Sequence, residues 1–329
     1  MKKNNVSSRK VNTQGIVVSV VAVALAAFFS IVSPSFRMWP TIVTLFDSFY
    51  YFMFMAIGVT FCLISGGNDL SVGTGTVCYA LIGGFCIANG APTWLGMLIC
   101  IALGVAFGCL NGFLVAKMNL PAFIATLCTM LATRGLGSVV SGGSVTWPSR
   151  NSADGWFRSI FKIFVKNAAG KKVPVPVGLI LVVVAIIVMT IVLKKTHTGR
   201  YIIAIGSNKE AARLSGVNVV KYQAMAYVIS GLFAGIASIA YVSATSSSIT
   251  PGAGGGLELD AIGGAIIGGT SMTGGTGSIF GTFLGVMILT LLKNGLPKIG
   301  LNAEWQSIIT GLILIGAIWL DVIRNRKKA

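Results

Sequence analysis

Ten stretches of this 329-residue chain are apolar over roughly the length that a helix needs to cross a lipid bilayer. A transmembrane helix takes about 20 predominantly apolar residues, and seven of the stretches meet this condition clearly: 15–33, 42–64, 94–116, 121–140, 177–193, 222–244 and 304–320. The stretches 72–89, 257–269 and 278–292 are short or rich in glycine, as expected of broken or half-length helices that line a pathway. We therefore predict an all-α, polytopic membrane protein with about ten transmembrane helices, eight being possible.

The composition excludes most other classes of protein. Apolar residues make up 54% of the chain and charged residues only 10%, and the mean hydropathy is +0.85. Soluble domains carry about 25% charged residues, so a soluble enzyme, a disordered chain and an ordinary nucleic-acid-binding protein are excluded. All six cysteines lie in or beside apolar stretches, and the single histidine, His197, lies in a basic loop. We therefore expect no metal site, no disulfide and no catalytic residues.

The net charge of +17 predicts how the chain is oriented in the membrane. Cytoplasmic loops carry an excess of Lys and Arg. The tails 1–14 and 321–329 carry four basic residues each, and the loop 194–221 carries six more. We therefore place both tails and this loop in the cytoplasm, which demands an even number of crossings. The residues between the tails, 15–320, are assigned to a single transmembrane domain that begins with an uncleaved first helix.

The segment 141–176 is predicted to be an external loop, although its six cations depart from that rule. Its apolar residues within 156–165 recur at i, i+1, i+4 and i+5, which predicts an amphipathic helix in the membrane interface. Arg158, Lys162 and Lys166 fall between these apolar residues. The helix either anchors the loop to the lipid surface or forms a basic platform on which an extracytoplasmic partner docks.

The two halves of the chain carry similar patterns in the same order. In the first half, GGNDL at 66–70 opens one stretch, and glycines repeat every fourth residue within 104–112. In the second half, GGGLELD at 254–260 opens a stretch, and glycines repeat again within 277–285. The first pattern starts on the external side and the second on the cytoplasmic side. We therefore predict inverted repeats, which are typical of transporters.

Polar side chains stand at the openings of these stretches. Asp69 and Asp260 each lie at the start of a predicted helix, where an acidic residue caps free backbone N–H groups. The alternative is contact with a polar substrate or an ion, because ionisable groups in membrane segments are costly and often functional. The position of Arg134 near the end of a predicted helix favours a side chain that snorkels to the membrane surface over one that contacts the substrate. The candidate pathway residues are Asn68, Asp69, Asn111, Glu258 and Asp260.

The loop 194–221 contains the most specific local motif. Ser207 and Glu210 form an S-x-x-E capping box, and Gly216 follows at a position that ends a helix. A short, exposed helix is therefore predicted over 208–215. It is either a simple connector or a docking element. The sequence contains no GxxxxGK[ST] pattern, so any pumping must be powered by another protein.

Several of these segments resemble known transporters. The stretch 210–216 (EAARLSG) resembles the EAA loop of ATP-binding-cassette (ABC) transporter permeases. Four ordered segments are similar to permeases of the ribose, galactose and xylose type of sugar importer: 65–73 (SGGNDLSVG), 128–136 (CTMLATRGL), 199–217 (GRYIIAIGSNKEAARLSGV) and 257–277 (LELDAIGGAIIGGTSMTGGTG). Asn68 departs from the apolar residue usual in that family, and the loop 141–176 looks longer than is typical.

The resemblance implies a permease subunit of a bacterial cytoplasmic (inner) membrane importer for a monosaccharide or a related polyol. Its partners would be a second permease copy or homologue, a cytoplasmic ABC ATPase and an extracytoplasmic sugar-binding protein. ATP would be bound by the ATPase, so the chain itself would need no cofactor. The coupling helix 208–215 would sit in a cleft of the ATPase and drive alternating access. Its contact residues would be Glu210, Ala211, Ala212, Arg213 and Gly216.

The residues leave two other functions open. An ion-coupled secondary transporter of a small polar solute would bind its ion at Asp69, Glu258 or Asp260. That function explains the inverted repeats but gives the capped helix no role. A channel would pass solute without any energy source, and the stretches broken by glycine allow it.

Overall fold

The computed structural model describes residues 13–167, 170–245 and 248–326, and helices in these residues occupy all ten apolar stretches. They are α1 (Thr13–Val32), α2 (Trp39–Ile64), α3 (Val72–Ala88), α4 (Thr93–Gly112), α5 (Ala122–Ser141), α6 (Gly178–Lys195), α9 (Val219–Ala244), α10 (Leu257–Ile267), α11 (Ile279–Gly295) and α12 (Ala303–Arg326). Seven helices in the described part are long and apolar enough to cross a membrane. The prediction of an all-α, polytopic membrane protein is confirmed, whereas the exact number of crossings stays a prediction.

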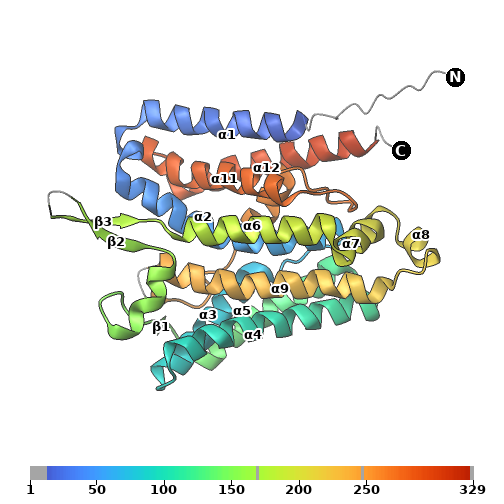
Figure 1. The fold of residues 1–329 in the computed structure, drawn as a ribbon, viewed down its shortest axis with the longest axis horizontal. Coiled ribbons are helices and arrows are strands. Elements are labelled where there is room, and N and C mark those ends of the chain that lie inside the picture. Colours follow the sequence, from blue (N-terminus) through green and yellow to red (C-terminus); the bar gives the residue numbers. More distant parts are fainter. Residues whose placement is uncertain (1–12, 168–169, 246–247, 327–329) are drawn as a thin grey trace.

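The two ends of the helical bundle carry different elements (Figure 1). The start of α1 and the last turns of α12 lie at one end, together with α7 (His197–Ser207) and α8 (Lys209–Leu214). The opposite end carries the short elements η1 (Pro34–Arg37), β1 (Val145–Thr146), η3 (Ala153–Ile160), β2 (Ile163–Lys166), β3 (Lys172–Val175), β4 (Ser248–Ile249) and η4 (Leu296–Ile299). This arrangement agrees with an even number of crossings. We refer to these ends as the inner and the outer end.

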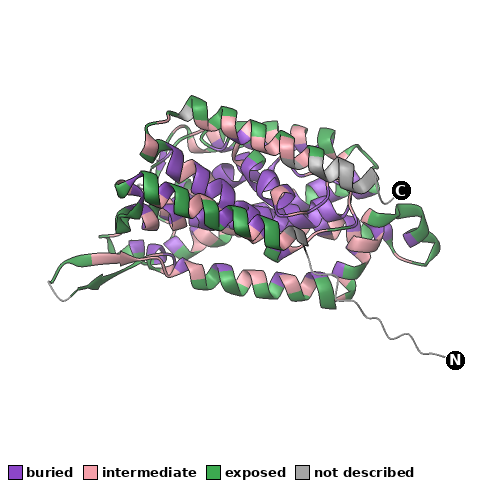
Figure 2. Cartoon of the chain, turned by 90° about the horizontal axis from the view of Figure 1, so that it is seen from above, coloured by how far each residue is buried: buried purple, intermediate pink, exposed green. Residues whose placement is uncertain are grey.

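Helices α2 and α9 form the centre of the bundle, and most of their residues are buried. Buried residues gather in the middle of the bundle, while the peripheral helices expose one face (Figure 2). The two central helices cross where Gly58 lies against the main chain of Ser230. A side chain at position 58 would collide with that main chain, so the crossing requires a small residue.

Glycines also set the distance between α4 and α9. Gly104 and Gly108 of α4 lie directly against Gly231 and Gly235 of α9, with backbone facing backbone. Helices in lipid gain little from hydrophobic association, so they associate through close packing of this kind. The glycine-rich pattern of the sequence is thus explained here by tight helix packing. Helix α4 then continues into a π-helical turn, Phe113–Lys117, at the inner end.

Helix packing repeats between the two halves of the chain. If α2 to α5 correspond to α9 to α12, the main contacts in one half have counterparts in the other. The contacts of α2 with α11, α3 with α4 and α3 with α5 are matched by those of α9 with α4, α10 with α11 and α10 with α12. Helix α2 also contacts α9, and α3 contacts α10, as elements beside a two-fold axis would. This pattern agrees with the predicted inverted repeats.

Helices α3 and α10 begin inside the bundle. Helix α10 has 11 residues, so it is only about 16 Å long and too short to cross a bilayer. The first turns of the two helices meet where Gly73 lies against Glu258 and Gly254. The chain reaches this meeting point through the irregular segment 65–71 from one end and through 250–256 from the other. Two of the three predicted broken helices are therefore present as α3 and α10, and their N-termini face one junction. The third stretch, 278–292, lies instead in a helical segment, Ile279–Ile299, that is long and apolar enough to cross a membrane.

Replacing Gly104 with alanine should weaken the contact between α4 and α9. The added Cβ would collide with the carbonyl oxygen of Gly231, and overpacking of this kind typically costs about 1–3 kcal/mol. We expect a lower Tm of the detergent-solubilised protein, measured by the fluorescence of a thiol-reactive or intrinsic probe. Gly311→Ala is the matched control, because no atom lies near a Cβ at that position of α12. Equal Tm values for the two variants would contradict this packing.

Candidate functional site

Asp69 is buried beside the start of α3, and its carboxylate accepts several hydrogen bonds. Its Oδ1 accepts hydrogen bonds from the backbone N–H (3.0 Å) and the hydroxyl (2.6 Å) of Ser71, and its Oδ2 accepts from the Ser230 hydroxyl (2.7 Å). Asn111 of α4 donates from Nδ2 to the Ser71 hydroxyl (2.9 Å) and accepts from the Thr129 hydroxyl (2.8 Å). The carboxylate thus holds the start of α3 against α4 and α9, in line with the structural role that the sequence favours.

Asp260 makes the equivalent link in the second half with different chemistry. Its carboxylate pairs with the ammonium of Lys293 in the last turn of α11, just as Asp69 reaches Asn111 near the end of α4. The Lys293 ammonium also lies 5.0 Å from the centre of the Phe52 ring. Lys293 lies near the outer end, yet its ammonium reaches the buried Asp260 carboxylate. A buried carboxylate is costly unless it is paired, which explains why Lys293 turns inward.

Two of the candidate pathway residues retain unused hydrogen-bonding capacity. Glu258 is 7% exposed, and its Oε1 accepts from the backbone N–H of Gly256 (3.1 Å). Its Oε2 has no hydrogen-bond partner within the described residues, and the same is true of Oδ1 of Asn68. Buried polar atoms are rarely left unpaired. Of the five candidates, these two are therefore the ones that keep an unpaired acceptor oxygen within the described part of the chain.

The external loop differs from the predicted amphipathic helix. A 3-10 helix, η3, ends at Ile160, and the chain then forms the antiparallel hairpin β2–β3, with Ile163 opposite Val175 and Lys166 opposite Lys172. The alternating β-branched residues favour strands. Two hydrogen bonds also hold the hairpin against α2, from Trp39 to the Pro174 carbonyl and from Tyr50 to the Pro176 carbonyl. The helical periodicity of the loop was therefore misleading beyond Ile160.

The three basic residues predicted to form a docking platform lie in different environments. Arg158 is 4% exposed and donates to the carbonyls of Pro148 (3.0 Å), Val242 (2.9 Å) and Thr245 (3.2 Å). Burial lowers the pKa of its guanidinium, and the charge of Arg150 contributes to the same shift. Lys162 pairs with the Asp47 carboxylate, whereas Lys166 is exposed on β2. Only Lys166 is thus presented to solvent.

Asp47 was not among the residues singled out from the sequence. It lies within α2 and is 8% exposed. The available signal was a single acidic residue within an otherwise apolar stretch, because such a residue needs a partner. That partner, Lys162, is 115 residues away in sequence.

The predicted helix 208–215 is present as α8, but its N-terminal cap lies one residue later than expected. The Asn208 side chain accepts from the backbone N–H of Ala211 (2.9 Å). The hydroxyl of Ser207, the last residue of the preceding helix α7, donates instead to the Ile203 carbonyl. The S-x-x-E capping box does not form, and Glu210 instead pairs with Arg213 (2.9 Å). Gly216 has φ +81° and ends the helix as predicted.

Helix α8 protrudes from the inner end and is fixed at its base. Glu210, Ala211 and Arg213 are exposed, whereas Ala212 packs on Ile205 of α7 and Val219 of α9. An open groove of about 660 Å³ separates α7 from α8. The sequence did not predict this groove, because it depends on the angle between the two helices. Its lining residues include His197, Arg200, Tyr201, Asn208, Ala211 and Ser215.

Breaking the Asp260–Lys293 pair should destabilise the protein more than removing it entirely. Lys293→Met leaves the Asp260 carboxylate unpaired in the interior, which typically costs about 3–5 kcal/mol. The double variant Asp260→Asn with Lys293→Met removes both charges and should recover much of that loss. Thermal unfolding of the three proteins in the same detergent checks this expectation. If the double variant unfolds at the same temperature as Lys293→Met or below it, the two residues do not act as a pair.

Comparisons with known proteins agree with this architecture. Residues 41–318 match the family described as "Branched-chain amino acid transport system / permease component". The ribose import permease protein of Escherichia coli (strain K12) is 35% identical over 94% of this chain and 93% of its own length. The xylose transport system permease protein of Haemophilus influenzae (32% identical, 97% of this chain and 99% of its own length) and the fructose import permease protein of Bifidobacterium longum (35%, 83% and 79%) are also similar.

No solved structure matches the chain. The family match covers more than four fifths of the sequence and includes all or most of each helix that occupies an apolar stretch, except α1. The chain therefore belongs to this family of transport permeases and is a multi-pass protein of the bacterial inner membrane.

Proposed function

We propose that the chain is the membrane-spanning subunit of an ABC importer that carries a monosaccharide, such as ribose, galactose or xylose, or a related polyol. The similar proteins are named as import permeases for ribose, fructose and xylose, and their likeness extends over most of the chain. In this proposal a partner ATPase binds ATP, and the chain needs neither a cofactor nor an ATPase site of its own. An extracytoplasmic sugar-binding protein delivers the solute.

The exposed helix α8 is the observation that carries the coupling role. The small Ala211 side chain permits close approach of a partner, and Arg213 can pair with an acidic residue of that partner. Ala212 connects α8 to α7 and α9 through a small apolar cluster. A displacement of α8 by the ATPase would therefore be transmitted to α9, which lies at the centre of the bundle. The rigid helices would then turn ATPase closure into alternating access.

Reversing the charge of α8 should uncouple transport from ATP hydrolysis. Glu210 and Arg213 pair with each other. Arg213→Glu alone therefore removes an ion pair within α8 and also changes the charge that α8 presents to a partner. The double variant Glu210→Arg with Arg213→Glu restores an internal pair while keeping the reversed surface. We expect at least tenfold slower uptake in both variants, because a charge-assisted contact with the ATPase is lost. Lys195→Glu, exposed at the end of α6, should transport normally.

Co-purification of the ATPase with each variant completes this test. Loss of the ATPase from both α8 variants, with the permease still inserted in the membrane, is the expected result. Normal uptake by the double variant would show that Glu210 and Arg213 serve only each other, and the coupling role would be abandoned.

The outer hairpin is the second docking element in this proposal. Lys166 and Lys172 are exposed and lie opposite each other on β2 and β3. Like charges in directly opposed positions destabilise a hairpin, and an acidic partner would relieve that repulsion. The hydrogen bonds from Trp39 and Tyr50 hold the hairpin rigidly on α2. A sugar-binding protein with an acidic rim fits this surface, whereas Arg158 and Lys162 support it from within.

Removing both hairpin charges should weaken the response to the binding protein. For Lys166→Gln with Lys172→Gln, we expect a severalfold higher concentration of binding protein for half-maximal stimulation of the ATPase, since steering by charge is lost. The effect should shrink at high salt. Lys298→Gln is the control, because Lys298 is exposed at the same end but lies outside the hairpin. An unchanged stimulation curve would leave the hairpin with an anchoring role only.

A second permease copy, or a homologue, completes the importer. The segment 250–256 is irregular, and part of it is exposed in the single chain. Irregular backbone at membrane depth is tolerated only where protein or a water-filled cavity covers it. A partner subunit packed over this segment would enclose such a cavity between the two copies.

A further inference from the structure

Arg134 lies on an exposed face of α5, within a segment long and apolar enough to cross the membrane. It stands seven residues before the end of that helix, which places its backbone about 10 Å below the outer end. The described residues provide it with no ion pair. A guanidinium stays charged in proteins, and a charged side chain that faces lipid is costly.

The backbone beside Arg134 is also unsuited to lipid. Gly252 and Gly256 adopt φ angles of +83° and +92°, and no atom lies near a Cβ built on either of them. Gly252 is exposed, and Gly254 lines a narrow cavity together with Arg134. Polar backbone groups of this kind lie at membrane depth only against protein or water. Two independent features of this surface, a charge and an irregular backbone, thus indicate an aqueous pathway.

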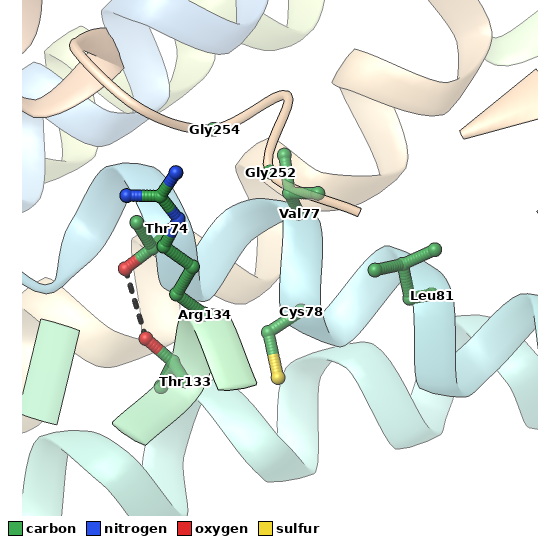
Figure 3. Close-up of a pocket in the computed structure, with 8 residues that line it drawn as sticks. All are labelled: Thr74, Val77, Cys78, Leu81, Thr133, Arg134, Gly252 and Gly254. Carbon is green, nitrogen blue, oxygen red and sulfur yellow. Dashed lines mark hydrogen bonds between the residues drawn. The ribbon is translucent and has the colours of Figure 1, made fainter. Parts of the chain in front are cut away.

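The Arg134 side chain turns toward the junction of α3 and α10. Figure 3 shows it beside Thr74, extending toward the segment that carries Gly254. The hydroxyls of Thr74 and Thr133 are 2.8 Å apart and line the same cavity. A side chain that snorkels to the lipid surface would extend away from this junction. The cavity has room for about one water molecule in this conformation, so a larger solute requires the junction to open.

The Glu258 carboxylate faces the same junction from α10. It lies against Gly73 at the start of α3, and the next residue, Thr74, lines the cavity together with Arg134. Its Oε1 is held by the Gly256 N–H, but its Oε2 has no hydrogen-bond partner within the described residues. The junction therefore offers a fork of donors from Arg134 and one free acceptor from Glu258.

We propose that Arg134 and Glu258 form a solute-contacting station in the translocation pathway and select a neutral, polyhydroxylated solute. Adjacent hydroxyl groups can accept from the guanidinium and donate to Oε2 at the same time. Because the two side chains carry opposite charges, the station favours neither anions nor cations. This inference rests on the proposed import of a sugar or polyol and assigns the contact to two residues.

Cysteine labelling tests whether Arg134 faces water. Arg134→Cys and Leu136→Cys are compared after the two exposed cysteines, Cys109 and Cys128, are replaced by serine. Position 136 is also exposed and lies closer to the outer end, but it points about 160° away around the helix. A charged, membrane-impermeant methanethiosulfonate should label position 134 at least tenfold faster. Equal labelling rates at the two positions would overturn the aqueous assignment.

Transport by reconstituted complexes tests the solute contact. With the ATPase and the binding protein present, Arg134→Gln and Glu258→Gln should each slow sugar uptake about tenfold or more, because a hydrogen bond to a charged group is lost. Arg134→Lys should recover part of the rate, and Lys298→Gln should match the unaltered protein. Uptake of a pentose and of its deoxy analogue should become more nearly equal in the slow variants.

The outcomes separate this inference from the proposed function. If the unaltered complex takes up no sugar or polyol, the proposed import function fails. If the unaltered complex takes up sugar and both Arg134→Gln and Glu258→Gln do so at the same rate, the station is wrong although the import function stands. If the variants are slow but keep the original ratio of pentose to deoxy analogue, the two residues support the fold and do not contact the solute.

Discussion

Interrupted helices within the membrane have backbone groups that no lipid can satisfy, and the rest of this structure depends on how those groups find partners. In the first half, Ser71 and Asp69 provide the start of α3 with hydrogen bonds that extend to Ser230 and Asn111. In the second half, Glu258 accepts from the N–H of Gly256 at the start of α10. Both interruptions lie at the junction of α3 and α10. The most polar part of the bundle is thus concentrated where a solute would pass.

The two halves use the same architecture with different side chains. Asp69 links to an amide on α4, whereas Asp260 links to an ammonium on α11. The central helices α2 and α9 pack through small residues, so they have little room to deform. A bundle of this kind moves as rigid parts that tilt against each other. Helix α8 at the inner end and the rigid hairpin at the outer end are the places where partner proteins could act on those parts.

The sequence predicted the helices well, because seven of those in the described part of the chain are apolar over a length that only a membrane span explains. All ten stretches are helical. The glycine-rich segments that precede α3 and α10 interrupt the helices, as expected. Where the predictions were wrong, individual hydrogen bonds determined the structure. Asn208 displaced Ser207 as the cap of α8, and hydrogen bonds from Trp39 and Tyr50 hold the hairpin where a helix was expected. Unlike the cap, the two hairpin contacts join residues 135 and 126 positions apart in sequence, so periodicity cannot reveal them.

The same limit applies to the site. One of the two alternatives from the sequence placed Arg158 on a docking platform for a partner, yet Arg158 is buried and donates to carbonyls at the end of α9. Conversely, the sequence shows Arg134 only as an isolated basic residue within a predicted transmembrane helix. Its relation to Glu258 and the segment 250–256 emerges once α5 and α10 both pack against α3. The sequence therefore identified most of the polar residues in the spans but could not tell which of them remain free to bind.

The source of energy for uptake tests the central claim most directly. Proteoliposomes that contain this chain, its cognate ATPase and the binding protein should accumulate labelled sugar only when ATP is supplied on the side of α8. Proteoliposomes that contain the chain alone should show no accumulation under a proton or sodium gradient. Accumulation driven by an ion gradient in the absence of the ATPase would contradict the account.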